Sequence, residues 1–462
     1  MRAALLSALI ALAPLTARSA VDDAHVRALA AGYKAAFLCS DLFDAHLSEA
    51  QATADDLEGI YPEYQALVRV LPAQVDTVRR TVSVAFDARL APRISAWRPG
   101  LGCTTLPIGA GPQAIARLPH LAAKPPPGDP DARPWPDGDR GGRFPGPPAL
   151  TAAVARMFDA AATPAGGTTT AVLVMRDGKI LAERYRAGFD LHTPQRTWSA
   201  AKSLTATVIG RASQLGLVKV DASANIPEWR APGDPRARIT LVQLMQMGSG
   251  LWTNGPGNRT DEIYLGGAAI TQAATMMPLE AAPGSRWRYA NDDTLLASRS
   301  VRAALGDGQR AIDFPFTQVL WPIGMRHTTP ETDWQGNFIL SSQVWTTARD
   351  LGRLALLYDR DGVWDGKRLL PPGWSRFVAT PAPAQPETAA TGGPGYGAFF
   401  WLPGSKAGLP LGTYYMNGNR GQFVFIVPSK HVILVRRGFD PAVGARFDEA
   451  RFAREMLAAL GG

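Results

Sequence analysis

Cysteine, histidine and long apolar runs are scarce in this 462-residue chain, which has two cysteines and six histidines. There is no H-E-x-x-H motif and no local run of His with Asp, which argues against a metallohydrolase. G-x-S-x-G is also missing, so the nucleophile elbow of Ser-His-Asp hydrolases is not expected. Beyond the N-terminus, no apolar run is long enough to span a bilayer. The sequence predicts no metal ligand and no cofactor.

Charge of one sign is not concentrated anywhere. The formal charge is +8, from 48 Lys and Arg against 40 Asp and Glu. The arginines are scattered, and no basic run is interleaved with aromatic residues, as a nucleic-acid site would require. We therefore expect no nucleic-acid partner, and the sequence indicates no particular oligomeric state.

Residues 1–20 have the pattern of a secretory signal peptide. Arg2 gives a positive start, and the apolar stretch after it is too short to cross a membrane. Ala17-Arg18-Ser19 offers a small-x-small cleavage pattern, with cleavage after Ala20 as an alternative. No cysteine adjoins this site to carry a lipid. The sequence thus predicts an exported protein, periplasmic or secreted, without a stable membrane anchor.

The two cysteines, Cys39 and Cys103, are predicted to form a disulfide, because an even number in an exported protein favours pairing. Closing a loop of this length is worth about 4 kcal/mol in the chain-entropy model. The turn expected at 97–103 would then be pinned to the first helix. The alternative is two buried free thiols.

Composition divides the rest of the chain into three parts. Residues 21–122 form an N-terminal extension, with helical periodicity over 26–43 and a strand pattern over 82–86. This extension carries no constellation that can be assigned to chemistry. Residues 123–149, rich in Pro, Gly, Asp and Arg, are expected to be an extended linker or an ordered surface connection. Residues 150–462 form the remaining domain.

Strand patterns lie at both ends of that domain. Asp177-Gly178 is a strong hairpin signal between two of them. The middle, to about residue 390, is expected to be mostly helical. One antiparallel sheet assembled from both ends, with helices packed on it, would be an α/β (α+β) fold. The expected helices cover 150–158, 200–215, 240–247 and 445–460, and the expected strands cover 169–174, 179–185, 414–416, 423–427 and 432–436.

Ser199 and Lys202 form the only S-x-x-K pair in the chain. Positions i and i+3 share a helix face, so this spacing brings the Lys202 amine to the Ser199 hydroxyl. A lysine can take the serine proton if burial or a nearby charge lowers its pKa. Backbone N–H groups at the first helical turn can stabilise developing negative charge. His192 lies close by in sequence, but a loop or core role is expected of it.

A Y-x-N pair, Tyr289 and Asn291, follows a Pro-Gly turn. A phenol beside a lysine can pass a proton to or from the serine oxygen and the leaving group. The Asn291 amide is placed to bond Lys202 or a substrate carbonyl. Asp292 and Asp293 are expected to cap the helix that follows.

A second Y-x-N match, at 415–417, leads into a glycine-rich stretch over 417–422. Gly418 lets a substrate lie against the strand backbone. The N–H of Asn419 is a natural second oxyanion donor beside that of Ser199. The alternative interpretation of this stretch is a common glycine-rich hairpin turn.

These motifs, in this order, resemble the serine β-lactamase/penicillin-recognising family. The resemblance covers about 165–440 and is to the class C β-lactamase-like branch, above all to 6-aminohexanoate-oligomer hydrolases and related esterases. Further matching stretches are 244–251, 321–325, 347–351 and 362–374.

The resemblance implies an antiparallel sheet plus an all-helical region, with the site between them. The roles it implies are Ser199 as nucleophile, Lys202 as base, Tyr289 as proton shuttle, Asn291 as support, the N–H groups of Ser199 and Asn419 as oxyanion donors, and Tyr264 as a substrate-contacting tyrosine.

One departure from the family bears on the substrate. β-Lactamases and penicillin-binding peptidases have a Lys-Thr-Gly or His-x-Gly motif whose cation holds the substrate carboxylate. Met416-Asn417-Gly418 offers no cation there, and Arg420 lies two residues further on. A hydrolase of a small-molecule ester or amide is therefore predicted. The alternatives are a β-lactamase or D-Ala-D-Ala peptidase, and a non-catalytic binding or sensing protein, against which the intact catalytic set argues.

Overall fold

The computed structural model describes residues 16–141, 144–253 and 260–461, with side chains from Ala24 onward. Residues 1–15 of the predicted signal peptide lie outside the described residues, and residues 16–20 are the start of helix α1, Thr16–Phe43. Among the helices that are described, none is long and apolar enough to cross a membrane.

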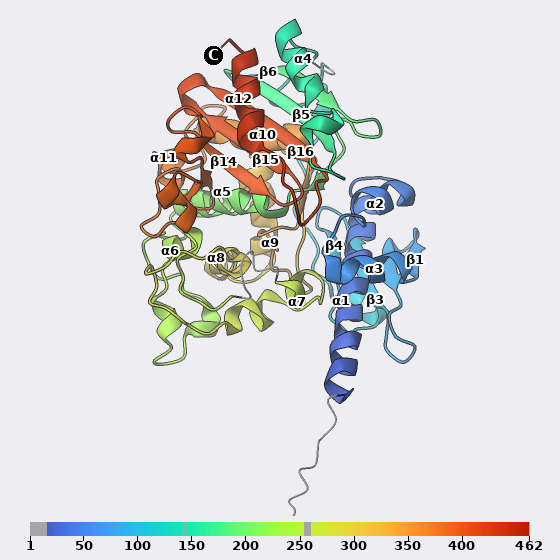
Figure 1. The fold of residues 1–462 in the computed structure, drawn as a ribbon. Helices are drawn as coiled ribbons and strands as arrows, with labels where there is room; N and C mark the ends of the chain where they lie inside the picture. The colour runs from blue at the N-terminus through green and yellow to red at the C-terminus, as the bar shows by residue number, and fades with distance from the viewer. Residues whose placement is uncertain (1–15, 142–143, 254–259, 462) are drawn as a thin grey trace, which may run out of the picture.

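A seven-stranded antiparallel sheet, in the order β12-β13-β14-β15-β16-β5-β6, lies in the upper part of the molecule in the view of Figure 1. β16, near the end of the chain, pairs with β5, so the predicted sheet built from both ends is confirmed. The strands are β5 Thr169–Arg176, β6 Lys179–Tyr185, β12 Gly395–Tyr396, β13 Trp401–Leu402, β14 Tyr414–Gly418, β15 Gln422–Val427 and β16 Val432–Gly438.

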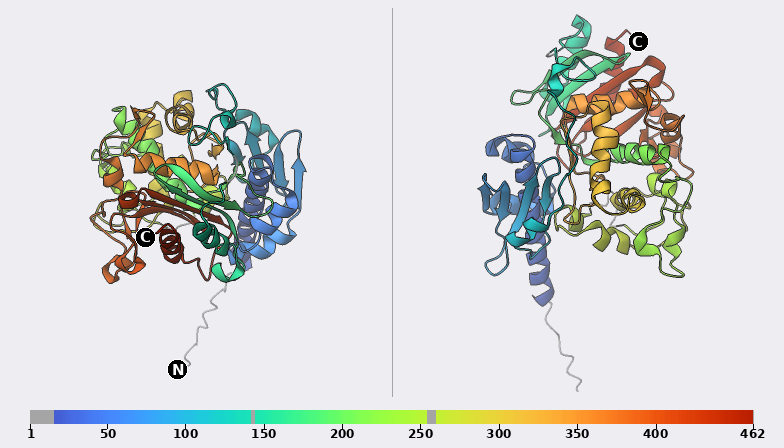
Figure 2. Two further views of the ribbon diagram at one scale, coloured as in Figure 1. Left: turned by 90° about the horizontal axis from the view of Figure 1, so that it is seen from above. Right: turned by 180° about the vertical axis from the view of Figure 1, so that it is seen from behind.

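Helices cover both faces of this sheet (Figure 2). Successive residues of a strand point to opposite faces. Accordingly, Val172 and Val174 of β5 pack in one apolar cluster, whereas Leu173 packs in the other. The first cluster holds α4 and α12, and the second holds α5 and α10. Their bounds are α4 Pro148–Arg156, α5 Ala201–Gln214, α10 Ala348–Asp359 and α12 Glu449–Ala459.

The region between α5 and the last strands is only partly helical, so the expectation of a mostly helical middle is wrong in part. Besides α10, the α-helices in its described residues are α6 Leu241–Met245, α7 Asp261–Tyr264, α8 Asn291–Ala304, α9 Gln309–Pro315 and α11 Trp374–Val378. β7 Gln195–Arg196, β8 Thr328–Pro330 and β9 Val344–Thr346 form a second sheet, and β10 Val363–Trp364 and β11 Lys367–Arg368 form a hairpin. Strands of two or three residues are too short to show an alternating pattern.

The N-terminal extension builds its own four-stranded sheet, β1-β2-β3-β4, against a long helix. Its elements are α1 Thr16–Phe43, α2 Glu49–Asp55, α3 Pro62–Val70, β1 Ala73–Asp76, β2 Thr81–Val84, β3 Arg93–Arg98 and β4 Gly102–Thr105. Its buried side chains join those around α5 in one apolar cluster. The Phe37 ring, for example, lies 5.6 Å from that of Trp198.

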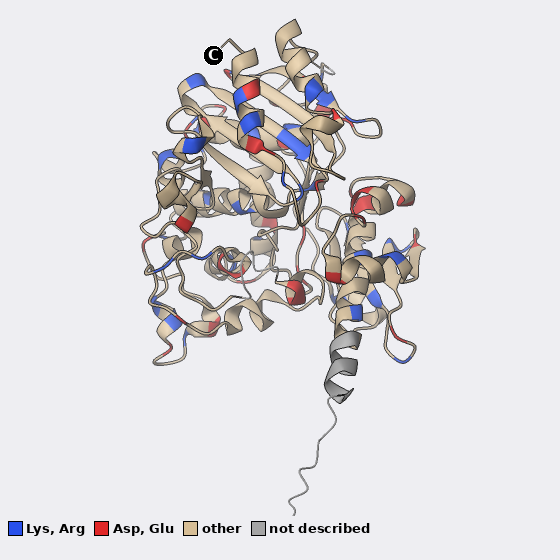
Figure 3. Cartoon of the chain, viewed as in Figure 1, with Lys and Arg blue, Asp and Glu red and all other residues tan. Residues whose placement is uncertain are grey.

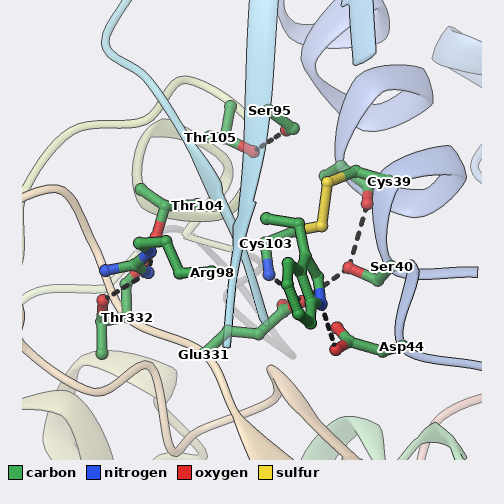
Figure 4. Close-up of a disulfide and its surroundings, with 12 residues drawn as sticks. Cys39, Ser40, Asp44, Ser95, Arg98, Cys103, Thr104, Thr105, Glu331 and Thr332 are labelled. Carbon is green, nitrogen blue, oxygen red and sulfur yellow. Dashed lines mark hydrogen bonds between the residues drawn. A yellow bond between two sulfur atoms is a disulfide. The ribbon is translucent and has the colours of Figure 1, made fainter. Parts of the chain in front are cut away.

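The predicted disulfide between Cys39 and Cys103 is confirmed, and it joins α1 to β4 (Figure 4). The expected turn over 97–103 is shorter than predicted, because β3 and β4 occupy both of its ends. The Ser40 hydroxyl and the Cys103 N–H both donate to Glu331, just after β8, at 2.5 and 3.2 Å. The disulfide end of the extension is thereby tied to the main body.

The described part of the Pro- and Gly-rich segment, residues 123–141 and 144–149, is an ordered connection, one of the two alternatives for it. It differs from the prediction in reaching the interior: Asp139 is buried, and its carboxylate pairs with Arg349 and Arg353 at 3.2 and 2.7 Å. Elsewhere, basic and acidic residues are interspersed in the view of Figure 3.

Candidate active site

Ser199 lies in a tight turn between β7 and α5. The Thr197 N–H donates to the Val344 carbonyl oxygen of β9, and residues 198–200 then form one 3₁₀ turn that leads into α5. Trp198 has φ +50°, a left-handed conformation that costs an L residue roughly 1–2 kcal/mol. Packing of its ring against Phe37 and under Arg196 holds it there. The nucleophile candidate is thus presented, half-buried, on a fixed turn.

The Lys202 amine lies at the centre of the site. Its Nζ is 3.2 Å from Ser199 Oγ, as the i, i+3 spacing predicts. It also donates to Asn291 Oδ1 at 2.6 Å and to the Ser341 carbonyl oxygen at 3.0 Å. The side chain is almost fully buried. All three of these partners are neutral.

This environment sets the pKa of Lys202. Burial lowers the pKa from its ordinary 10.5 to about 7, although the nearby Asp292 raises it. A substantial fraction of the amine is therefore neutral near pH 7. A neutral amine beside a serine hydroxyl can accept its proton.

Tyr289 is the second neighbour of the serine. Its hydroxyl is hydrogen-bonded to Ser199, and its ring centroid lies 4.9 Å from Lys202 Nζ. Burial raises the pKa of Tyr289, and this outweighs the lowering by the bond to Ser199. The phenol therefore keeps its proton at neutral pH and can donate it.

The start of α8 differs from the prediction. The helix begins at Asn291, after Ala290, and no side chain caps it. Asp292 and Asp293, expected as caps, lie inside its first turn and are buried. Asp293 accepts from the Ser249 hydroxyl at 2.7 Å, and burial raises its pKa to about 7. Asp292 instead acts on the charge of Lys202, a role that sequence reasoning missed.

The end of β14 lies directly against the serine turn. A Cβ added to Gly418 would lie 2.1 Å from the Thr197 carbonyl oxygen, so only glycine fits. Gly418 also pairs with Gln422, which puts a tight hairpin turn immediately after it. Asn419 is the first residue of that turn. Its side-chain amide, Nδ2, donates to the Tyr61 hydroxyl at 3.2 Å.

Tyr264 ends α7 and is buried behind Lys202. Its hydroxyl is hydrogen-bonded to the Ser341 hydroxyl, and the Ser341 carbonyl accepts from Lys202. In the structure, Tyr264 is thus linked to Lys202 through Ser341. Substrate contact by Tyr264 stays a prediction. Ser341 was missed from the sequence, where it is an ordinary serine without a motif.

Arg420, the nearest cation after the glycine motif, is turned away from the serine. Its guanidinium is buried and donates to the carbonyl oxygens of Asp55 and Glu58 at 2.9 and 2.7 Å, in the N-terminal extension. Beside Tyr289 there is instead an aromatic group. The rings of Trp287 and Trp401 lie 6.3 and 5.6 Å from that of Tyr289.

Comparison with known proteins matches this architecture. The β-lactamase family model matches residues 154–437. The chain belongs to the β-lactamase family. A curated relative, the 6-aminohexanoate-dimer hydrolase of Paenarthrobacter ureafaciens, is 25% identical to this family member over 299 residues, 58% of this chain and 72% of the relative.

Solved structures share the fold of this β-lactamase-family protein. A family VIII carboxylesterase is 14% identical and aligns over 69% of this chain and 99% of its own, with a TM-score of 0.53. A class C β-lactamase is 15% identical over 68% of this chain and 96% of its own, with a TM-score of 0.51. At these identities the likeness shows the fold alone.

Proposed function

We propose that this protein is a serine hydrolase that cleaves a small ester or amide through an acyl-enzyme on Ser199. The observation that carries the proposal is the position of Ser199 Oγ between Lys202 Nζ, at 3.2 Å, and the hydrogen-bonded hydroxyl of Tyr289. One neighbour can take the serine proton and the other holds a proton to give.

The mechanism follows from these protonation states. Neutral Lys202 takes the proton of Ser199 as Oγ attacks the substrate carbonyl carbon. The N–H groups of Ser199 and Asn419 hold the oxyanion that forms. Tyr289 donates its proton to the leaving oxygen or nitrogen and regains one from Lys202.

Deacylation runs through the same groups. Water loses a proton to the base as it attacks the ester carbon of the acyl-enzyme. The Ser199 oxygen leaves and is reprotonated, which restores the starting state.

Two features support an ester or amide rather than a β-lactam. The Arg420 guanidinium is occupied by carbonyl oxygens of the N-terminal extension, so it does not supply a cation for a substrate carboxylate. The aromatic group beside Tyr289 suits an uncharged chain. The names of the relatives, a 6-aminohexanoate-dimer hydrolase and a family VIII carboxylesterase, agree with amide and ester cleavage.

The test is a substrate panel with matched serine variants. Wild type, Ser199→Ala and the exposed control Ser223→Ala are assayed with a p-nitrophenyl ester, the linear 6-aminohexanoate dimer and a chromogenic β-lactam. We expect turnover of the ester or the amide by wild type and Ser223→Ala, and none by Ser199→Ala. Preferred turnover of the β-lactam would reassign the substrate. A folded wild type that turns over none of them would favour a binding protein.

We also propose that the protein is exported, on the basis of residues 1–20. The Cys39–Cys103 disulfide agrees with an oxidising compartment. N-terminal sequencing of the protein from fractionated cells tests this: a start near residue 20 or 21 outside the cytoplasm is expected, and an intact N-terminus in the cytoplasm would contradict it.

A further inference from the structure

Four side chains from three separate stretches of the chain converge on the main body. They are Asp131 and Asp139 of the ordered connection, His192 of the loop before β7, and His327 just before β8. One nitrogen or oxygen of each lies within 4.8 Å of the corresponding atom of every other. No sequence motif links them.

The atoms that converge are those that ligate metals. His192 Nε2 lies 3.0 Å from Asp131 Oδ2, and His327 Nε2 lies 3.4 Å from Asp131 Oδ1. His327 Nε2 is also 3.9 Å from Asp139 Oδ2. Tetrahedral zinc with bonds of about 2.0–2.1 Å holds its ligand atoms about 3.3–3.4 Å apart. These three separations lie on either side of that length, but the two histidines face different oxygens of Asp131, so a bound ion would have to draw the four ligand atoms together.

Hydrogen bonds hold the Asp139 carboxylate and the backbone of both histidines. Arg349 and Arg353 both bond Oδ1 of Asp139, which leaves Oδ2 as the atom nearest His327. The backbone N–H of His327 donates to Asp350 at 2.9 Å, and that of His192 donates to Asp190 at the same distance. The bonds to Asp139 are of the kind that orients a ligand in known metal sites, and the two backbone bonds hold the chain at the histidines.

The local charge also suits a divalent cation. Arg349 and Arg353 are each shared with a second buried carboxylate, Glu183 and Asp350 respectively. The carboxylates therefore outnumber the guanidinium groups around the two histidines. Imidazole together with carboxylate is a ligand set that zinc accepts readily.

We propose that Asp131, Asp139, His192 and His327 form a tetrahedral zinc site. Four protein ligands make such a site closed and structural rather than catalytic. It would clamp the 123–149 connection to the two strands, β7 and β8, on either side of β9. Because β7 leads through Thr197 into the Ser199 turn, zinc would stiffen the entry to that turn. The proposal does not depend on the hydrolase activity.

The test measures zinc directly. Full-length protein is stripped with EDTA, dialysed against zinc chloride and assayed for bound zinc by elemental mass spectrometry, with affinity from calorimetry. His431→Ala is the matched control, because His431 also pairs with an aspartate, Asp359, at 3.2 Å but has no further ligands in the described structure. We expect one zinc per chain in wild type and His431→Ala, and at least about tenfold weaker binding in His192→Ala and His327→Ala.

Two results would overturn the site: wild type that takes up no stoichiometric zinc, or His192→Ala and His327→Ala variants that keep wild-type affinity. Cobalt substitution of the unmutated protein guards against variants that misfold. A tetrahedral site gives intense visible absorption from bound cobalt, displaced by zinc, and its absence from cobalt-treated wild type would contradict the proposal.

Discussion

The protein buries cations in two opposite ways, at Lys202 and at Arg349. Both side chains are almost fully buried. Lys202 is surrounded by neutral acceptors, and burial lowers its pKa to about 7. Burial also lowers the pKa of Arg349, but its pairing with Glu183 outweighs this, and the net shift is upward. A buried cation with ionic partners supports structure, and one without them becomes a base.

Removing Lys202, the buried cation with neutral partners, should have the largest effect on the rate of hydrolysis. We expect Lys202→Met to lower kcat/KM by about 10³–10⁴-fold, because the proton acceptor for Ser199 is lost. Esterase or amidase assays of the purified variant measure this. A variant that keeps a tenth or more of the rate would place the base elsewhere.

The same substitution should stabilise the fold, in a pH-dependent way. Below pH 7 the folded wild type carries the full cost of a buried charge. Between about 7 and 10.5 the folded state has lost the proton that the unfolded state keeps, so stability rises with pH. Lys202→Met removes this cost, and we expect the free energy of unfolding to rise by roughly 1–3 kcal/mol below pH 7, with the loss of the Lys202–Asn291 hydrogen bond already subtracted. Urea unfolding at pH 6 and 9 should show the gain shrinking as pH rises.

Removing Arg349, the buried cation with ionic partners, should instead lower the stability of the fold. We expect Arg349→Met to destabilise the protein by about 3–5 kcal/mol, because Glu183 is left buried and charged. The double variant Arg349→Met/Glu183→Gln should recover part of the loss in urea unfolding. Equal losses in the single and double variants would show that the missing packing of Arg349, rather than the orphaned charge, sets the cost.

The pKa of Lys202 should appear in the rate profile. We expect kcat/KM to rise with pH through a midpoint near 7 as the amine loses its proton. Asp292→Asn should move that midpoint down by less than about one unit, since Asp292 raises the pKa of Lys202. A flat profile from pH 5 to 9, or an upward shift in Asp292→Asn, would contradict this assignment.

The smallest expected effect is at Tyr264, whose hydroxyl bonds Ser341 behind the lysine. If it supports the Ser341 carbonyl that accepts from Lys202, Tyr264→Phe should lower kcat less than about tenfold and leave KM unchanged. Steady-state kinetics separate the two constants. A raised KM with unchanged kcat would favour the substrate contact inferred from the family resemblance.

The sequence predicted the parts of the site that local spacing controls. Ser199 and Lys202 meet because three residues separate them at the start of a helix, and Tyr289 and Asn291 reach them from the start of α8. The strand patterns at both ends of the domain, with the hairpin signal at Asp177-Gly178, likewise predicted the seven-stranded sheet.

Groups brought in by tertiary packing could not be predicted in this way. Ser341 reaches Lys202 through its backbone carbonyl, which every residue has. Asp292 has the pattern of a helix cap but lies within the helix, because α8 begins earlier than its capping residues suggest. The two histidines near Asp131 and Asp139 meet only because β7 and β8 pair with the same strand.

The central claim is a covalent intermediate on Ser199, and intact-mass spectrometry tests it most directly. Wild type and Ser199→Ala are incubated with a p-nitrophenyl ester or a fluorophosphonate, quenched in acid, and digested to locate the adduct. We predict one added acyl or phosphonyl group per wild-type chain, on the peptide that contains Ser199, and none on Ser199→Ala. An adduct of equal yield on both proteins, or none on folded wild type, would contradict it.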